Sequence, residues 1–222
     1  MSDSTVFPRP ASSVVMIREG SSDLEVLMVE RQPRGFFGGL MVFPGGAVED
    51  CDVELASTVD DQHRVAAVRE TAEEVGILIT GAAPQPSPSA RGATLLAEVG
   101  VDRVRAAASQ LILISRWLTP SSAPKRYDTW FFLAGVDGDP EITLDRDELV
   151  GYCWITPRNA LRRLEAGDWN MILPTVSHLR WLSRFSSRVD AELAASGTDG
   201  LTIIEPVALA DGTLSARYRG DS

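Results

Sequence analysis

Cysteine and histidine are scarce in this sequence, and long apolar runs are absent. The two cysteines, Cys51 and Cys153, have no partners at metal-ligand spacing, which fits a reduced, cytoplasmic compartment. No apolar run reaches the roughly 18 residues that a membrane-spanning helix needs, so we predict no membrane association. The N-terminus has no basic start followed by an apolar stretch, and we therefore predict no secretory signal.

Basic residues are also in the minority. The chain has 21 Lys and Arg against 31 Asp and Glu, and its formal net charge is −10. Nucleic acid is not an expected partner, because phosphate backbones attract basic surfaces. The charge would suit a protein that collects divalent cations, but composition alone favours an ordinary acidic surface.

The rest of the composition is that of a globular protein. Hydrophobic residues make up 44% of the 222 residues, which is enough for one domain with a sizeable core. Strands and helices are predicted without a regular alternation, which favours an α+β fold built in layers. The predicted strands are 13–18, 24–31, 40–43, 77–80, 111–118, 129–136 and 148–155, with a hairpin of 201–207 and 213–218 around Asp211-Gly212. The predicted helices are 61–75, 91–108, 157–166 and 174–194; loops are predicted at 32–39, 50–60 and 81–90, and Pro44-Gly45-Gly46 is expected to break the strand before it.

The helix predicted at 61–75 has an acidic face. At about 100° per residue, Glu70, Glu73 and Glu74 share one arc of the helix. Like charges at this spacing repel one another, and a bound cation would remove that cost. Carboxylate oxygens suit Mg²⁺ or Mn²⁺. The alternative is a solvated acidic face. The opposite arc carries Ala67, Val68, Thr71, Ala72 and Val75.

The residues around this helix carry a recognisable motif. A strand ends in Phe43-Pro44-Gly45-Gly46, an acidic stretch follows, and then comes Arg69-Glu70-x-x-Glu73-Glu74-x-Gly76-Ile77. This pattern resembles the Nudix box, G-x5-E-x7-R-E-U-x-E-E-x-G-U, in which U is aliphatic. The second half of the box is complete here, and we identify the chain as resembling the Nudix hydrolase family.

The resemblance implies a fold and a role for each matched residue. It implies a Nudix-like α/β/α sandwich with a mixed β-sheet, formed by one domain over 1–222 with extra C-terminal helices at about 157–195. Glu70, Glu73 and Glu74 would bind Mg²⁺ or Mn²⁺, and Glu73 or Glu74 would assist a metal-activated water as a base. Arg69 would orient the acidic side chains. Gly46 would allow a tight turn beneath the helix, and Gly76 would end it.

The first half of the box is irregular. Five residues follow Gly46, and the next position, where the pattern has Glu, is Asp52; 16 residues then precede Arg69 where the pattern has seven. The box therefore contains an insertion at about 50–62, and Glu49, Asp50 and Asp52 compete for the role of its first carboxylate. An Asp in this slot with an insertion resembles the branch that includes the peroxisomal coenzyme A diphosphatases. The segments Arg116–Pro120 and Arg126–Thr129 also fit that branch.

Other candidate site residues lie outside the box. Glu148 resembles the loop acid that reaches the metal in many Nudix enzymes, with Asp147 as the fallback; an ordinary surface acid is the alternative. Arg34, in a Gly-flanked loop, is the best of several candidates for a phosphate contact. Phe36 and Phe37 could stack on a substrate or pack in the core.

Two further expectations concern histidines and packing. His63 is expected to be exposed and His178 to be a packing residue, since neither has a metal-ligand partner. The apolar stripe of residues 174–185 is expected to pack on the sheet, with a homodimer contact as the second interpretation.

The function that the resemblance implies is metal-dependent hydrolysis of a nucleoside diphosphate linked to another group. The preferred substrate is coenzyme A or an acyl-CoA. One alternative is a Nudix enzyme that acts on ADP-ribose, NADH or nucleoside triphosphates, because substrate contacts lie on loops outside the box. The other is a non-catalytic Nudix sensor that binds a nucleotide. In each case the partner is a nucleotide-containing small molecule.

Overall fold

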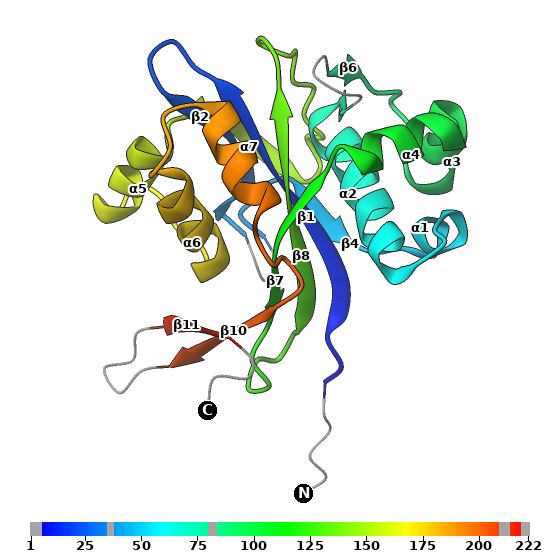
Figure 1. Ribbon diagram of the computed structural model, residues 1–222. Helices are drawn as coiled ribbons and strands as arrows, with labels where there is room; N and C mark the ends of the chain where they lie inside the picture. Colours follow the sequence, from blue (N-terminus) through cyan, green and yellow to red (C-terminus); the bar gives the residue numbers. More distant parts are fainter. Residues whose placement is uncertain (1–5, 35–37, 80–83, 209–213, 219–222) are drawn as a thin grey trace, which may run out of the picture.

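The computed structural model describes residues 6–34, 38–79, 84–208 and 214–218, and a mixed sheet runs through its centre (Figure 1). The strand order is β11-β10-β7-β8-β1-β2-β3, with β4 paired to β1 and β9 to β2. β1 runs parallel to β8 and β10 runs parallel to β7, whereas the other pairs are antiparallel. The strands are β1 (Arg9–Glu19), β2 (Leu24–Arg31), β3 (Met41–Val42), β4 (Gly45–Ala47), β7 (Ile112–Leu118), β8 (Tyr127–Val136), β9 (Leu149–Ile155), β10 (Ile203–Ala208) and β11 (Leu214–Tyr218); β5 (Ile77–Leu78) and β6 (Gln85–Pro86) form a separate pair.

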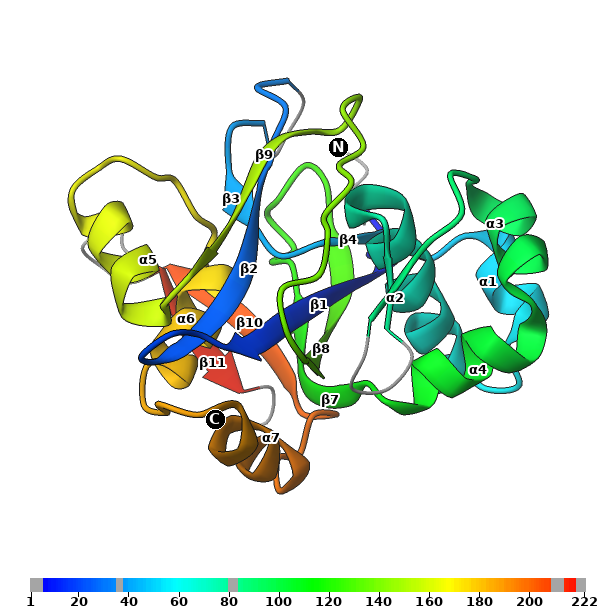
Figure 2. The same cartoon turned by 90° about the horizontal axis from the view of Figure 1, so that it is seen from above.

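Helices cover both faces of the sheet, as Figure 2 shows from above. One face carries α1 (Asp50–Leu55), α2 (Val59–Val75), α3 (Gly92–Val99) and α4 (Val101–Ser109), and the other carries α5 (Pro157–Glu165), α6 (Leu173–Leu182) and α7 (Arg188–Ser196). The predicted α+β class and the three-layered arrangement are therefore confirmed. Among the described helices, none combines the length and apolar character needed to cross a bilayer.

The central strand β1 explains why two helical layers are needed. Val14 and Met16 belong to the core beneath α2, α3 and α4, whereas Val15 and Ile17 belong to the core beneath α6 and α7. Successive side chains of a strand point to opposite faces, so an uninterrupted apolar run must be covered on both sides.

Two local predictions around the box have different outcomes. Residues 50–55, which we predicted as a loop, form α1, and the Asp52 carboxylate accepts a hydrogen bond from the Glu49 backbone N–H at 2.8 Å. A helix of six residues, whose start is stabilised by such a capping contact, is too short to show helical periodicity in the sequence. The preceding strand β3 ends at Val42, so the break expected at Pro44-Gly45-Gly46 is confirmed; Gly45 and Gly46 then begin the separate strand β4, which pairs with β1. Gly45 lies so close to β1 that a Cβ would meet the Ser12 carbonyl oxygen at 2.3 Å.

Two long predicted helices are each divided. The helix predicted at 91–108 breaks at Gly100, whose φ of 86° ends α3 before α4 begins. The helix predicted at 174–194 is α6 followed by α7, and the Ser187 side chain caps α7 by accepting a hydrogen bond from the Asp190 N–H. The two strands of the C-terminal hairpin are confirmed, whereas its predicted Asp211-Gly212 turn lies outside the described residues.

Candidate active site

The acidic helix α2 is buried on almost every side. The Thr58 side chain caps its start by accepting from the Asp61 N–H, and Gly76 ends it with φ of 72°. Glu70 and Glu74 are only 9% and 2% exposed. The alternative of a solvated acidic face is therefore wrong, because β4 covers the acidic side of the helix.

Arg69 organises the acidic side of α2 from within the protein. Its guanidinium is 1% exposed and donates to both carboxylate oxygens of Asp52, at 2.9 and 2.8 Å. It also donates to Glu70 at 2.9 Å and lies 3.5 Å from Glu73. These contacts match the orienting role that the resemblance implies. Of the three acids that competed for the first carboxylate of the box, Asp52 is fully buried against Arg69, whereas Glu49 lines the neighbouring cavity.

The glycine loop packs directly on the carboxylates. A Cβ at Gly46 would meet the Glu70 carboxylate oxygen at 2.4 Å, so only glycine fits there without displacing Glu70. The Gly45 N–H donates to Glu74 at 2.7 Å. At the end of the helix, a Cβ at Gly76 would approach Thr143 at 2.8 Å. The roles expected of Gly46 and Gly76 therefore have a steric basis.

Burial makes two of these carboxylates difficult to ionise. Desolvation raises the pKa of Glu70 to about 7, against the lowering effect of Arg69. Desolvation and the nearby charge of Glu70 raise the pKa of Glu74 to about 8. A cation beside such groups would favour their charged form, and their oxygens suit a hard divalent ion. The donor chemistry therefore fits Mg²⁺ or Mn²⁺.

Two arginines, however, lie among these acids. Arg31, at the end of β2, donates to Glu74 at 3.1 Å and to Glu148 at 3.3 Å. Arg91, just before α3, donates to Glu148 at 3.2 Å and also pairs with Asp145. Within the described part of the chain, no three acidic, histidine or cysteine side chains are placed to bind one ion together.

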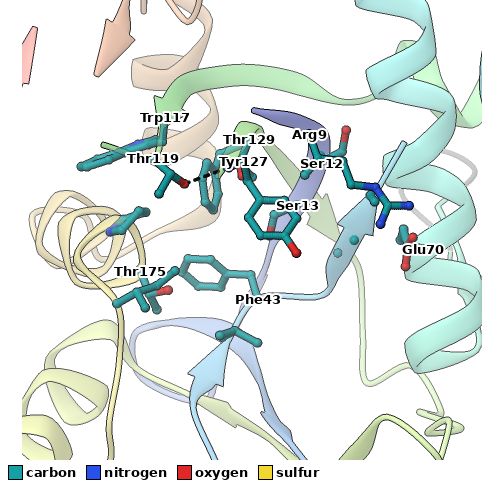
Figure 3. Close-up of a pocket in the computed structure, with 18 of the residues that line it drawn as sticks. Arg9, Ser12, Ser13, Phe43, Glu70, Trp117, Thr119, Tyr127, Thr129 and Thr175 are labelled. Carbon is teal, nitrogen blue, oxygen red and sulfur yellow. Dashed lines mark hydrogen bonds between the residues drawn. The ribbon is translucent and has the colours of Figure 1, made fainter. Parts of the chain in front are cut away.

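The acids and arginines form one end of a cavity of about 740 Å³. Glu70 projects from α2 on one side, and Phe43, Trp117 and Thr175 lie at the opposite side, as Figure 3 shows. The acidic end is lined by Glu49, Glu70, Glu73, Glu148, Arg31, Arg69 and Arg91. Towards the other end, where Figure 3 places Phe43, Trp117 and Thr175, the wall is largely apolar. The cavity is lined further by Val42, Leu118, Tyr127, Phe131, Met171, Ile172, Leu173, Pro174 and Pro206, and by the polar residues Arg9, Ser12, Ser13, Thr119 and Thr129.

The structure places the predicted site residues unequally. Glu70, Glu73, Arg69, Gly46 and Glu148 all line the cavity, whereas Glu74 lies behind its wall. Glu148, from a distant part of the sequence, reaches the same end as the box. Sequence reasoning missed Arg31, Arg91 and Asp145, because a lone arginine or aspartate at a strand end or in a loop carries no motif.

Three other expectations have clear outcomes. Arg34 does not reach the cavity, because its guanidinium donates to the Asp147 carbonyl oxygen at the surface. His63, expected to be exposed, is 3% exposed and stacks on Trp130 with ring centroids 4.4 Å apart, because the first turns of α2 also pack on the sheet. His178 is a buried packing residue as predicted. Phe36 and Phe37 lie outside the described residues.

The Nudix box geometry agrees with comparisons to known proteins. The NUDIX domain profile matches residues 7–93. The chain is 31% identical to a Nudix hydrolase of known structure from Alicyclobacillus acidocaldarius, with a TM-score of 0.70, over 87% of this chain and 97% of that one. The chain belongs to the Nudix hydrolase family.

The chain is also similar to two curated Nudix relatives. The putative nudix hydrolase 7 of Caenorhabditis elegans is 34% identical over 185 residues, which cover 79% of this chain and 61% of the relative. The acyl-coenzyme A diphosphatase NUDT19 of Gallus gallus is 27% identical, over 77% of this chain and 64% of the relative. The chain thus spans somewhat less than two thirds of the length of these two Nudix relatives.

Proposed function

We propose that this protein is a Mg²⁺- or Mn²⁺-dependent pyrophosphohydrolase whose preferred substrate is coenzyme A or an acyl-CoA. The observation that carries the proposal is the two-sided cavity, with carboxylates at one end and an apolar wall at the other. Hydrolysis would add water across the diphosphate and release 3′,5′-ADP and a 4′-phosphopantetheine moiety. The NUDT19 relative of Gallus gallus supports the substrate class only by the activity in its name, acyl-coenzyme A diphosphatase.

The acidic end is where we place the chemistry. Glu70, Glu73, Glu74 and Glu148 are the proposed metal ligands, and a bound cation would polarise the phosphate and activate water. Arg69 fixes the carboxylates of Glu70 and Glu73 by hydrogen bond and ion pair. The Gly92 N–H donates to the other oxygen of Glu73 at 2.7 Å. With its carboxylate fixed at both oxygens, Glu73 can accept a proton without first reorienting.

The apolar end is where we place the group on the far side of the diphosphate. Phe43 and Trp117 come from the sheet region, and Met171 and Leu173 come from the segment that enters α6. A pantetheine arm with an acyl chain would remove this surface from water, at a gain of about 25 cal/mol per Å². A nucleoside triphosphate has only its nucleobase to place there and carries no long arm. The cavity therefore favours a diphosphate with a long, weakly polar arm.

A hydrolysis panel read by mass spectrometry tests the proposal. Coenzyme A, acyl-CoAs of increasing chain length, ADP-ribose, NADH and the common nucleoside triphosphates would each be incubated with Mg²⁺ and separately with Mn²⁺. We expect selective release of 3′,5′-ADP from the CoA compounds. Cleavage of another compound in preference would retain the Nudix chemistry and reject this substrate. No cleavage with either metal, together with nucleotide binding by calorimetry, would support a non-catalytic sensor instead.

A further inference from the structure

Arg91 occupies an unusual position between the proposed metal ligands. Its guanidinium donates to Glu148 at 3.2 Å and lies 3.9 Å from Glu73. It also pairs with Asp145, in the loop before β9. Two of its three acidic partners are therefore residues that we assign to the metal, so a cation that bound them would remove partners from Arg91.

The contrast with Arg69 shows why Arg91 can move. Arg69 is 1% exposed, and its bidentate partner Asp52 is fully buried. The Arg91 side chain is 52% exposed, and its contacts to Glu148 and Glu73 are single rather than bidentate. The Arg91–Glu148 pair joins two partly exposed side chains, and such pairs contribute little stability, so its exchange for another partner has a small cost.

Once the cation has taken Glu73 and Glu148, Arg91 would keep its ion pair with Asp145, and the guanidinium N–H donors released from Glu73 and Glu148 would have one available class of partner inside the site. Arg91 lines the same cavity as Glu70 and Glu148. A guanidinium presents planar donors that match phosphate oxygens in a bidentate geometry. The backbone beside it is fixed, because the adjacent Gly92 N–H donates to Glu73.

We propose that Arg91 exchanges partners during the binding cycle. It neutralises Glu73 and Glu148 before the cation binds, and it binds the diphosphate of the substrate after the cation has taken those carboxylates. The proposal rests on the proposed pyrophosphohydrolase function. It predicts opposite effects of one substitution on two ligands, because Arg91 competes with the cation but supports the diphosphate.

Arg31 is a weaker candidate for this exchange. Its side chain is 29% exposed, and its partner Glu74 is 2% exposed. Removal of the Arg31 guanidinium would leave the buried Glu74 carboxylate without its ion-pair partner. A substitution of Arg31 would therefore combine a loss of stability with a loss of ligand binding. Arg91 offers the cleaner test.

The experiment compares wild type with Arg91→Gln by calorimetry, first with Mn²⁺ alone and then with methylenediphosphonate in saturating Mn²⁺. We expect Arg91→Gln to bind Mn²⁺ about two- to fivefold more tightly, since a competing ion pair is gone. We expect it to bind methylenediphosphonate roughly tenfold more weakly, since a charged hydrogen-bond donor is lost. Arg103→Gln is the matched control, because Arg103 is on the exposed side of α4 and contacts Gln85.

Arg91→Lys separates charge from geometry. It should keep the Mn²⁺ affinity near that of wild type and still lose part of the diphosphate affinity, because an ammonium cannot bind in a bidentate manner. A purely structural role of Arg91 would weaken both ligands together, and that result would overturn the exchange. Unchanged affinities in Arg91→Gln would overturn it too. If wild-type protein with Mn²⁺ bound no methylenediphosphonate, both the proposed pyrophosphohydrolase function and the exchange of partners by Arg91 would be rejected.

Discussion

The two ends of the cavity are built in different ways. At the acidic end, charged side chains are held by hydrogen bonds and ion pairs, as Arg69 is by Asp52 and Glu70. At the apolar end, the wall depends on packing, and one buried hydrogen-bond chain attaches α6 to β7. Ser115 Oγ lies 2.7 Å from His178 Nε2, and His178 Nδ1 lies 2.7 Å from the Pro174 carbonyl oxygen. The difference indicates that the acidic end has to hold its carboxylate groups in fixed positions, whereas the apolar end has to match the shape of a substrate group.

The two ends also differ in how the sequence encodes them. The box residues of the acidic end lie within about 30 positions of one another, from Gly46 to Gly76. The apolar end draws on residues from Val42 to Pro206. Contiguous residues can form a readable motif, and dispersed residues cannot. This explains why the chemistry is easier to infer than the substrate.

The largest effect should come from Glu74→Gln. The substitution keeps side-chain size and an acceptor for the Gly45 N–H, but it removes a charge from the proposed metal site. We expect kcat to fall roughly 10³-fold with the fold unchanged by circular dichroism. Glu165→Gln, on the exposed end of α5, is the control and should retain full activity. Turnover at the wild-type rate in Glu74→Gln would refute the assignment of Glu74.

A change at the apolar end should instead alter substrate preference. Met171→Gln keeps a similar volume but places an amide in the apolar wall. We expect KM for a long-chain acyl-CoA to rise about five- to tenfold, with KM for free coenzyme A and both kcat values little changed. Val189→Gln, on the exposed face of α7, serves as the control. An equal rise for both substrates would show that Met171 does not distinguish the acyl arm.

The smallest effect concerns pH and the acidic end alone. The native pKa values of Glu70 and Glu74, about 7 and about 8, lie above the unfolded value of 4.5, so the native protein binds more protons between these limits. The unfolding free energy of the metal-free protein should therefore fall as pH rises towards 8. Saturating Mg²⁺ should oppose this loss of unfolding free energy at high pH. We expect it to raise Tm by about 2–4 °C more at pH 8 than at pH 6.5.

Thermal melts with and without Mg²⁺ provide the measurement. Glu74→Gln should flatten the pH dependence of the metal-free protein, since the group with the higher pKa is gone. The range above pH 6.5 is chosen because burial lowers the pKa values of both His178 and His63 below 6.5, so the two histidines change the unfolding free energy mainly below pH 6.5, where the unfolded imidazoles are protonated. A Mg²⁺ effect of equal size at both pH values would contradict the assignment of these carboxylates to the cation.

The sequence predicted those parts of the fold that depend on local pattern. The apolar run of β1 and the helical period of α2 each identify their element, since the pattern reflects burial of that element's own residues. The position of Glu148 beside the box was predicted by resemblance and not by local pattern. Local pattern does not reveal the strand order, and the strand order decides which loop approaches α2. Arg34 was misplaced for the same reason: its loop is near the box in sequence, yet its side chain turns to Asp147.

Other features could not be predicted from the sequence, because they depend on tertiary contacts. His63 is polar by type but buried by its place against Trp130, where Ser12 and the Ala11 carbonyl lie within 3.1 Å of its Nδ1. Arg31 and Arg91 approach Glu148 from segments that are far apart in the sequence. Ion pairs of that kind leave no periodic signal, so only a structure brings them together.

The parallel pairing of β1 with β8 has a consequence for how the chain acquires its site during synthesis. The pairing joins residues 9–18 to residues 127–136, and the box lies between them. On the ribosome the box therefore emerges well before the strand that β1 needs as its neighbour. Pairings between distant segments form late and slowly, because a long loop must close first. A nascent chain that had released α2 but not β8 would carry the whole acidic motif without the sheet that positions it, and such a chain is a natural client for a chaperone.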